Sequence, residues 1–125
     1  MLQHIGIVGV GGFLGANARY WLGSWLGAWL GGRWPWATLV INVSGSLVIG
    51  LLLVLLTERV EVDPRWRLLF VTGFLGAYTT FSTFSWEAIE MIERAEYLPA
   101  AGYLMASVVL GLVGVAVGAG LARRL

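Results

Sequence analysis

Four long apolar stretches separated by short polar connectors dominate the pattern of hydrophobic positions along the chain. They cover residues 5–29, 36–56, 67–91 and 98–121. A bilayer core about 30 Å thick needs roughly 20 apolar residues in a helix, so each stretch is long enough to cross it once. The pattern therefore predicts an all-α membrane protein, with residues 1–125 forming a single domain of four transmembrane helices whose neighbours run antiparallel.

A polar segment interrupts the third stretch near its middle. Five hydroxyl residues fall within seven positions, interleaved with Phe81 and Phe84; they are Thr79, Thr80, Ser82, Thr83 and Ser85. Polar groups at membrane depth belong inside protein or along an aqueous path. Together with nearby glycines, they predict a broken third helix, whose free N–H groups and carbonyls form a site for ions. The alternative is that these hydroxyls bond the preceding turn or hold helices together.

Composition supports a membrane location and excludes several other classes of function. Of the 125 residues, 58% are hydrophobic and only 12% are charged, roughly half the charged fraction of a soluble domain. A formal net charge of +1 argues against a nucleic-acid partner. The chain has no cysteine, and His4 is its one histidine, so thiol chemistry and a histidine metal site have no basis. We expect no enzymatic activity.

The arginines predict an orientation in the membrane. The side with both termini and the second connector holds five of them: Arg59, Arg65, Arg67, Arg123 and Arg124. The opposite side holds Arg33 and Arg94. The excess of arginines, five on one side against two on the other, favours both termini in the cytoplasm. Together with the four spans, it predicts a multi-pass protein of the cell (inner) membrane. The margin is small, so insertion in both orientations stays open.

The first stretch contains several glycines and one charged residue, and each of these features needs an explanation. Glycines at positions 9, 11 and 15 imitate a dinucleotide-binding loop, but that motif needs an acid about 20 residues later, and the first acid is Glu58. Gly11 and Gly15, four apart, instead predict close helix packing in lipid. Arg19 lies about four turns into the helix, where an unpaired charge costs at least ~2.5 kcal/mol. It either reaches carbonyls or water at an interface, or holds anions.

Polar residues in the other stretches have a structural and a functional interpretation. Asn42 is an amide within an apolar helix, and it either bonds another helix or offers a donor to a permeating anion. Tyr103 and Ser107 share one helix face and either line a polar track or bond locally. Glu87 lies closest to the hydroxyl cluster among the glutamates that follow it.

Four short helices leave almost no interior, so these polar groups should meet at a subunit interface, most simply in a dimer. The membrane core has no acidic residue for proton coupling, and the chain has no nucleotide motif to power transport. Its polar groups are mostly donors, and aromatic ring edges carry partial positive charge. Phe81 and Phe84 share a helix face and could contact a dehydrated anion. The pattern predicts passive transport of a small anion.

Three motifs resemble the CrcB/Fluc family of fluoride channels. They are Gly-Gly-x-x-Gly-Ala-x-x-Arg-Tyr at residues 11–20, Thr-Leu-x-x-Asn-x-x-Gly at 38–45 and Gly-x-x-Gly-x-x-Thr-Thr-Phe-Ser-Thr-Phe at 73–84. The resemblance covers essentially the whole chain. It implies an antiparallel homodimer of four-helix subunits with dual topology in the lipid membrane, two fluoride pores and a central structural sodium ion.

The resemblance also implies roles for individual residues. The fluoride pathway would comprise Asn42, Phe81, Phe84, Ser82, Thr83, Tyr103, Ser107 and Glu87. Main-chain carbonyls of Gly76 and Thr79 would hold the sodium ion. Arg19 matches the family's membrane-embedded arginine, and we group it with Gly11 and Gly15 as interface residues. Ala77 departs from the family pattern, because members often have glycine there.

The implied function is passive, fluoride-selective export. Hydrogen fluoride enters a cell as a neutral acid and ionises inside, and a selective pore lets the trapped fluoride leave the cytoplasm without ATP. One alternative is a small proton-coupled multidrug-type exporter, but such proteins need a glutamate in the first helix, where this chain has Arg19 and no acid. A non-transporting scaffold subunit is a second alternative, and it leaves the hydroxyl and phenylalanine cluster unexplained.

Overall fold

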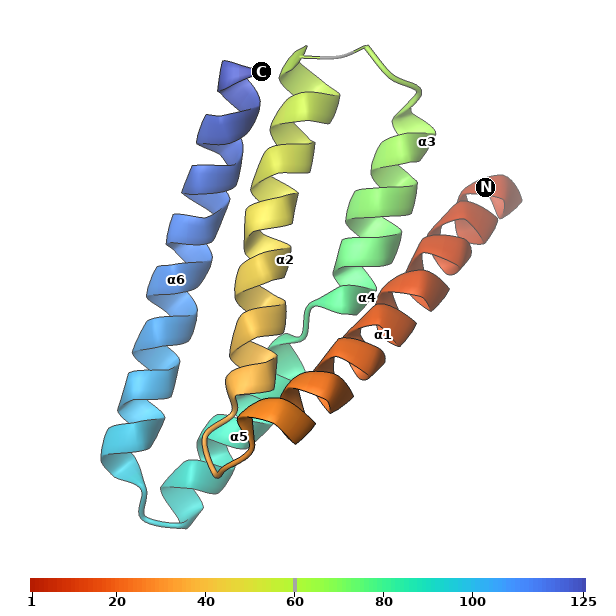
Figure 1. Cartoon of the computed structure of the whole chain (residues 1–125). Coiled ribbons are helices and arrows are strands. Elements are labelled where there is room, and N and C mark those ends of the chain that lie inside the picture. The colour runs from red at the N-terminus through yellow and green to blue at the C-terminus, as the bar shows by residue number, and fades with distance from the viewer. Residues whose placement is uncertain (60) are drawn as a thin grey trace.

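The computed structural model describes residues 1–59 and 61–125, and the described chain is predominantly helical. Its elements in order are α1 (Leu2–Leu30), α2 (Trp36–Val54), η1 (Leu55–Arg59), α3 (Pro64–Arg67), η2 (Leu68–Leu75), α4 (Gly76–Tyr78), α5 (Phe81–Glu93) and α6 (Tyr97–Arg124). The two η elements are π-helical. As Figure 1 shows, η1 continues α2, and α3, η2 and α4 form one rod that ends where α5 begins. This rod, which follows α1 and α2 along the chain, is called the third rod below.

Local chemistry sets the ends of these helices. Gly31 and Gly32 take positive φ angles of 50° and 88°, which glycine adopts without steric cost, and α1 stops there. Asp63 caps the third rod, since its Oδ1 accepts a hydrogen bond from the Arg65 backbone N–H at 2.9 Å. Pro64 occupies the first helical turn, where its missing N–H costs nothing.

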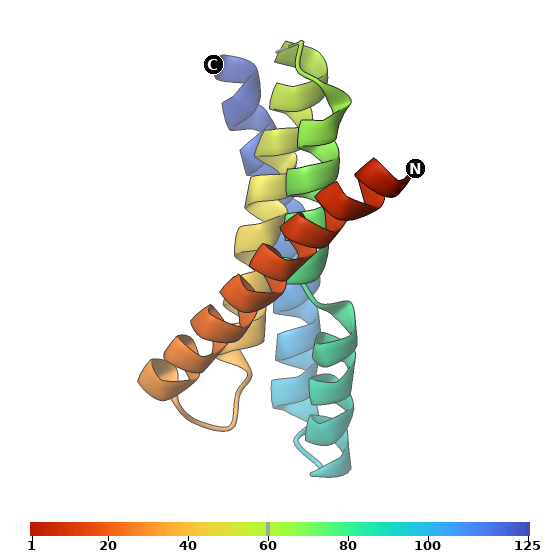
Figure 2. The same ribbon diagram turned by 90° about the vertical axis from the view of Figure 1, so that its right-hand side faces the viewer.

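Glycines allow the helices to pack closely. α2 and α6 lie side by side along much of their length (Figure 1), and α1 crosses the rod formed by α3, η2 and α4 obliquely (Figures 1 and 2). A Cβ atom at Gly50 of α2 would lie against the Val115 carbonyl, and one at Gly118 of α6 would lie against the Leu47 carbonyl. These backbones therefore touch directly, and only glycine fits.

Gly11 and Gly15 lie at the second close contact. A Cβ atom at Gly11 would meet the Leu69 carbonyl, and one at Gly15 would meet the Phe74 carbonyl. Both contacts join α1 to η2 of the same chain. The two glycines thus have a packing role within the subunit, and a role between subunits remains a prediction.

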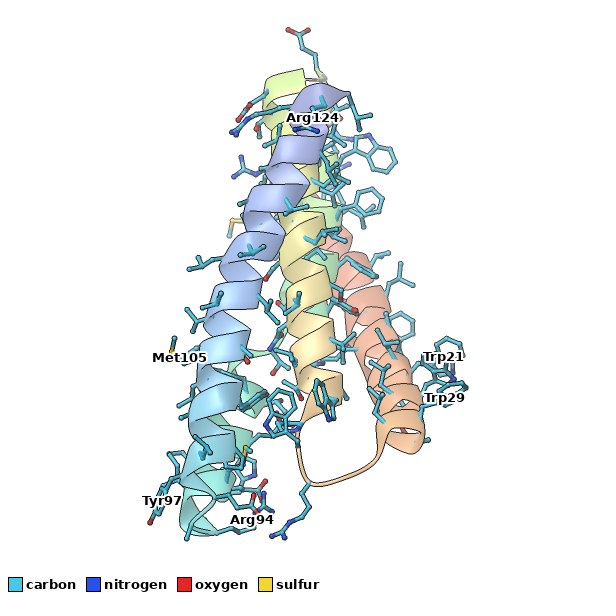
Figure 3. All side chains as sticks on the ribbon, turned by 60° about the vertical axis from the view of Figure 1, so that its left-hand side comes forward. Trp21, Trp29, Arg94, Tyr97, Met105 and Arg124 are labelled. Atoms are coloured by element: carbon cyan, nitrogen blue, oxygen red, sulfur yellow. The ribbon has the colours of Figure 1, made fainter. Side chains whose placement is uncertain are left out.

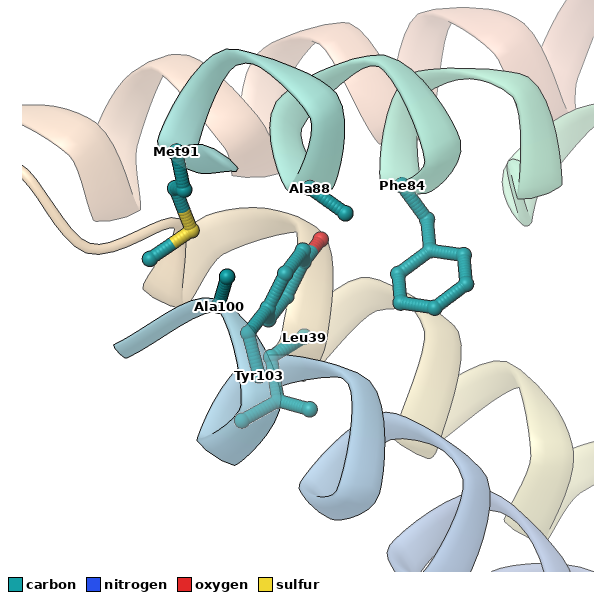
Figure 4. Close-up of a cluster of buried hydrophobic side chains, with 6 residues drawn as sticks. All are labelled: Leu39, Phe84, Ala88, Met91, Ala100 and Tyr103. Atoms are coloured by element: carbon teal, nitrogen blue, oxygen red, sulfur yellow. The ribbon is translucent and has the colours of Figure 1, made fainter. Parts of the chain in front are cut away.

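Two small clusters of buried side chains form the interior of the part of the chain that the structure describes. One joins α2, α5 and α6 through Leu39, Phe84, Ala88, Met91, Ala100 and Tyr103 (Figure 4). The other joins α2 to the α3–η2–α4 rod through Ile41, Leu75 and Tyr78. Most other apolar side chains face outward, including Trp21 and Trp29 on α1 and Met105 on α6 (Figure 3). An apolar outside around a thin core is the pattern of a protein solvated by lipid.

Among the described residues, three helical segments are long and apolar enough to cross a membrane: Trp36–Glu58, Pro64–Glu93 and Tyr97–Arg124. The prediction of an all-helical, multi-pass membrane protein is confirmed. The remaining predicted span, 5–29, lies within the 29-residue α1. That helix is long enough to cross but also carries glycines, tryptophans, Asn17 and Arg19.

Candidate functional site

The chain leaves helical geometry for two residues between the end of the third rod and α5. α4 ends at Tyr78, Thr79 is extended with φ −83° and ψ 159°, and Thr80 is extended with φ −150° and ψ 109°. α5 begins at Phe81, and the Thr80 hydroxyl caps it by accepting a hydrogen bond from the Thr83 N–H at 3.2 Å. Threonine suits both tasks, because it favours extended backbone and caps helices.

Asn42 of α2 holds this extended segment through both ends of its amide. Its Oδ1 accepts a hydrogen bond from the Thr80 N–H at 2.8 Å, and its Nδ2 donates to the Thr80 carbonyl at 3.0 Å. This pair satisfies the two backbone groups that the extended conformation removes from the helix. The interhelical bond that the sequence allowed for Asn42 is therefore present, and its Nδ2 retains a second N–H for another acceptor.

The same bonds change the partners of the two carbonyls predicted to hold sodium. In a continuous helix, the Thr80 N–H would donate to the Gly76 carbonyl and the Thr83 N–H to the Thr79 carbonyl. Here the Thr80 N–H donates to Asn42, and the Thr83 N–H donates to the Thr80 hydroxyl. Both carbonyls are thus released from those helical bonds at the same break.

A groove of about 350 Å³ opens beside the break, between α2, the third rod, α5 and α6. Six of the residues predicted for the ion sites line it: Asn42, Gly76, Thr79, Phe81, Phe84 and Ser107. The Ser107 hydroxyl oxygen is buried and has no hydrogen-bond partner among the described residues. A buried hydroxyl without a partner is costly, so this one is available to a ligand or to water.

The two phenylalanines of the groove differ greatly in exposure. Phe84 is 8% exposed within the core, whereas Phe81 is 79% exposed on the surface of the single chain. Their ring centroids lie 5.6 Å apart with the ring planes at 49°. Phe84 also meets the Tyr103 ring nearly edge-on, with centroids 5.2 Å apart. The aromatic row therefore leads from the surface of the groove to Tyr103.

A carboxylate network begins at Tyr103. The Tyr103 hydroxyl donates a hydrogen bond to Glu87 Oε2 at 2.7 Å, and the Thr38 hydroxyl donates to Glu87 Oε1 at 2.8 Å. Tyr103 is fully buried (Figure 4) and Thr38 is buried, while Glu87 is half-buried. We did not predict a role for Thr38 from the sequence, although it lies one turn before Asn42 on the same face of α2.

The remaining predicted residues lie outside these two arrangements. Ser82 and Thr83 are exposed near the start of α5, and Thr83 bonds the Thr80 side chain. Arg19 is half-buried on α1, and no hydrogen bond or ion pair from it reaches another described residue. The structure thus brings together six predicted residues in the groove and two more at the carboxylate network.

Comparisons with known proteins agree over nearly the whole chain. A family profile described as "CrcB-like protein, Camphor Resistance (CrcB)" matches residues 6–119. A fluoride-specific ion channel FluC of Chloroflexus aurantiacus is 43% identical over 122 residues, covering 98% of this chain and 97% of its own length. A protein of the same name from Solibacter usitatus is 45% identical, covering 94% and 97%, and one from Koribacter versatilis is 46% identical, covering 90% and 89%.

Proposed function

This chain belongs to the CrcB-like family, and from that membership we propose that it is a passive, fluoride-selective channel that lets fluoride leave the cytoplasm. The relatives named above are fluoride-specific ion channels, and the first two match 98% and 94% of this chain. Ion channels are not enzymes, and the family to which the chain belongs is one of ion channels.

The observation that carries the proposal is the chemistry of the groove. It offers the buried Ser107 hydroxyl without a partner and the spare N–H of Asn42, beside the Phe81 and Phe84 rings. Hydroxyl and amide donors replace water around an anion, while ring edges add weak positive charge. Fluoride is small and strongly hydrated, so it needs several such donors at short range, and a larger halide fits them poorly.

We propose that two copies assemble as an antiparallel homodimer of four-span subunits, in which α1 is the fourth span. In a single chain the groove opens outward and leaves Asn42 and Thr79 only partly covered at the depth of the bilayer. Polar groups facing lipid are costly, and a second copy over the groove would cover them. The nearly uncovered Phe81 would then meet protein rather than lipid.

A structural sodium ion at the centre of this dimer is a further part of the proposal. The break between α4 and α5 suits it, because carbonyl oxygens are the ligands that a hard cation prefers. The Gly76 and Thr79 carbonyls have lost the helical donors described above, so they would hold the ion. A bound cation would neutralise the carbonyl dipoles at the break and hold the two subunits together.

The polar residues then form a route for fluoride from the groove toward Glu87. The ion would pass the Asn42 amide and Ser107 hydroxyl, follow the edges of Phe81 and Phe84, and reach the hydroxyls around Glu87. Export would be passive, driven by the fluoride gradient alone. A proton-coupled exporter of the multidrug type is the alternative. Such an exporter needs a glutamate in its first helix, and α1 of this chain contains none.

Fluoride release from liposomes tests the proposal. Purified protein is reconstituted in vesicles loaded with equal fluoride and chloride, and both ions are measured outside with selective electrodes. Rapid fluoride release with chloride retained is expected for the wild type, and Phe81→Ile and Asn42→Ala should slow it sharply. Phe13→Ile is the matched control, since Phe13 is 69% exposed on α1 and does not line the groove. Release no faster than from empty vesicles would refute a channel.

A further inference from the structure

A second hollow, unrelated to the ion groove, lies between the first turns of α1 and the start of the third rod. Its volume is about 620 Å³, larger than that of the ion groove. Gly6 and Val10 of α1 and Leu69 of η2 give it an apolar wall. Asp63, Arg65 and Trp66 close it at the end where the rod begins. This second hollow is called the end groove below.

The position of the end groove matches the boundary of the membrane. The apolar segment that forms the rod starts at Pro64, so Asp63 and Arg65 lie at its outer edge and Leu69 lies more than one turn deeper. Trp66 is 48% exposed and stacks on Phe70 with ring centroids 5.7 Å apart. Half-exposed tryptophan is typical of the interface between hydrocarbon and headgroups. The polar end of the groove thus lies at headgroup depth and its apolar wall at acyl-chain depth.

The polar end presents one charge of each sign. The Arg65 Nε and the Asp63 Oδ2 are 3.6 Å apart, longer than a charge-assisted hydrogen bond, and both side chains are about half exposed. Asp63 Oδ1 already caps the rod, whereas Oδ2 and the terminal nitrogens of Arg65 have room for further partners. Guanidinium groups bind phosphate, and a carboxylate binds an ammonium group.

We propose that the end groove binds one zwitterionic phospholipid with a primary ammonium headgroup, a phosphatidylethanolamine. Its phosphate pairs with Arg65, its ammonium donates to Asp63 Oδ2, and the upper part of an acyl chain lies along Gly6, Val10 and Leu69. A choline headgroup has no N–H to donate to Asp63, and a glycerol headgroup has no positive charge. The charge pair therefore selects ethanolamine among common headgroups.

Gly6 supplies a direct test of the site. A Cβ atom at Gly6 would meet no atom within 4 Å, so a larger side chain there enters the groove without clashing with the protein. Gly9 on the same helix is equally open but does not line the groove. Gly6→Leu therefore fills the site, and Gly9→Leu is its matched control.

The measurement is lipid retention by native mass spectrometry. The purified full-length protein in detergent is titrated with dioleoyl phosphatidylethanolamine, phosphatidylcholine or phosphatidylglycerol, and bound lipids are counted. Wild type and Gly9→Leu should retain ethanolamine lipid about tenfold better than choline lipid, the factor expected for one charge-assisted hydrogen bond. Gly6→Leu should bring all three lipids to the same low level.

Two further variants separate the headgroup contacts. Asp63→Asn keeps a good helix cap but should remove the preference for ethanolamine over choline, while Arg65→Gln should weaken retention of both. Equal retention by Gly6→Leu and wild type, or tighter binding of phosphatidylglycerol than of phosphatidylethanolamine, would overturn the proposal. A change in oligomeric mass in Gly6→Leu would also overturn it, because it would assign the groove to a second copy. The measurement needs no ion flux, so its outcome is independent of fluoride transport.

Discussion

The side-chain amide of Asn42 pairs with the backbone of Thr80 on both sides, at 2.8 Å to its N–H and 3.0 Å to its carbonyl. One residue of α2 thereby replaces the helical partners of a residue 38 positions away. The consequence is a two-residue interruption between the third rod and α5 whose backbone groups keep hydrogen-bond partners. The amide that would face a passing anion is therefore also the group that holds the groove open.

Asn42→Ala should accordingly reduce both stability and transport. The change leaves the Thr80 N–H and carbonyl without this partner in a part-buried site, which costs about 1–3 kcal/mol for each group that finds no other partner. Thermal unfolding in detergent measures the first effect and vesicle fluoride release the second.

Asn42→Asp separates the two roles. It keeps the acceptor for the Thr80 N–H but puts a carboxylate oxygen where Nδ2 donates to the Thr80 carbonyl, and it offers an anion no donor. We therefore expect part of the stability and all of the fluoride release to be lost. Full release by Asn42→Asp would show that the amide acts only on the backbone.

Tyr103→Phe tests the carboxylate network. It removes the hydrogen bond to Glu87 and keeps the ring that meets Phe84 nearly edge-on. The Thr38 hydroxyl still serves the other carboxylate oxygen, so the protein should fold and the fluoride release rate should fall. Thr38→Val should act similarly.

The double variant gives the decisive comparison. Thr38 and Tyr103 serve one carboxylate, so their effects on release should not add, because residues that act on a shared partner are coupled. Strictly additive effects in the Tyr103→Phe, Thr38→Val double variant would contradict a joint role through Glu87.

Gly118→Ala tests the close contact of α2 and α6. The new methyl group would press on the Leu47 carbonyl and the Leu51 N–H, which are backbone atoms and cannot move aside easily. Overpacking of this kind costs about 1–3 kcal/mol, so the unfolding temperature should drop. Gly120→Ala is the control, since a Cβ atom there meets nothing within 4 Å. It should be neutral or slightly stabilising, and an equal loss in both variants would point to backbone conformation rather than contact.

The sequence predicts which polar residues form the site better than it predicts which of them bond to one another. The hydroxyl cluster between Gly76 and Phe84 and the amide of Asn42 are visible as polar residues in apolar stretches. Their pairing is not, because Asn42 and Thr80 meet only when α2 packs against the third rod. Thr38 was missed for the same reason, since a threonine near a helix start is unremarkable until Glu87 lies beside it.

The glycines show a similar limit. Gly11 and Gly15 were recognised as packing residues from their spacing. A spacing of four reveals a smooth helix face but not which backbone covers it, and here that backbone is Leu69 and Phe74 of the same chain. The broken rod and the crossing angle of α1 decide that contact, and neither follows from a local pattern.

The last prediction concerns sodium, which the break should bind through main-chain oxygens. A cation that binds only the folded protein raises the unfolding temperature as its concentration increases. We expect sodium to raise it more than potassium or choline at equal ionic strength. Thr79→Val should keep this dependence, because it retains the carbonyl and the methyl group that lies nearest to Gly45.

Asn42→Ala should weaken the sodium dependence, although Asn42 is not itself expected to touch the ion. Without the amide, the Thr80 N–H is free to return to the Gly76 carbonyl as in a continuous helix, and that oxygen is lost as a ligand. Unfolding temperatures measured across a series of sodium concentrations give the comparison. An identical response in Asn42→Ala and wild type would place the cation elsewhere, and no response in the wild type would remove sodium from the proposal.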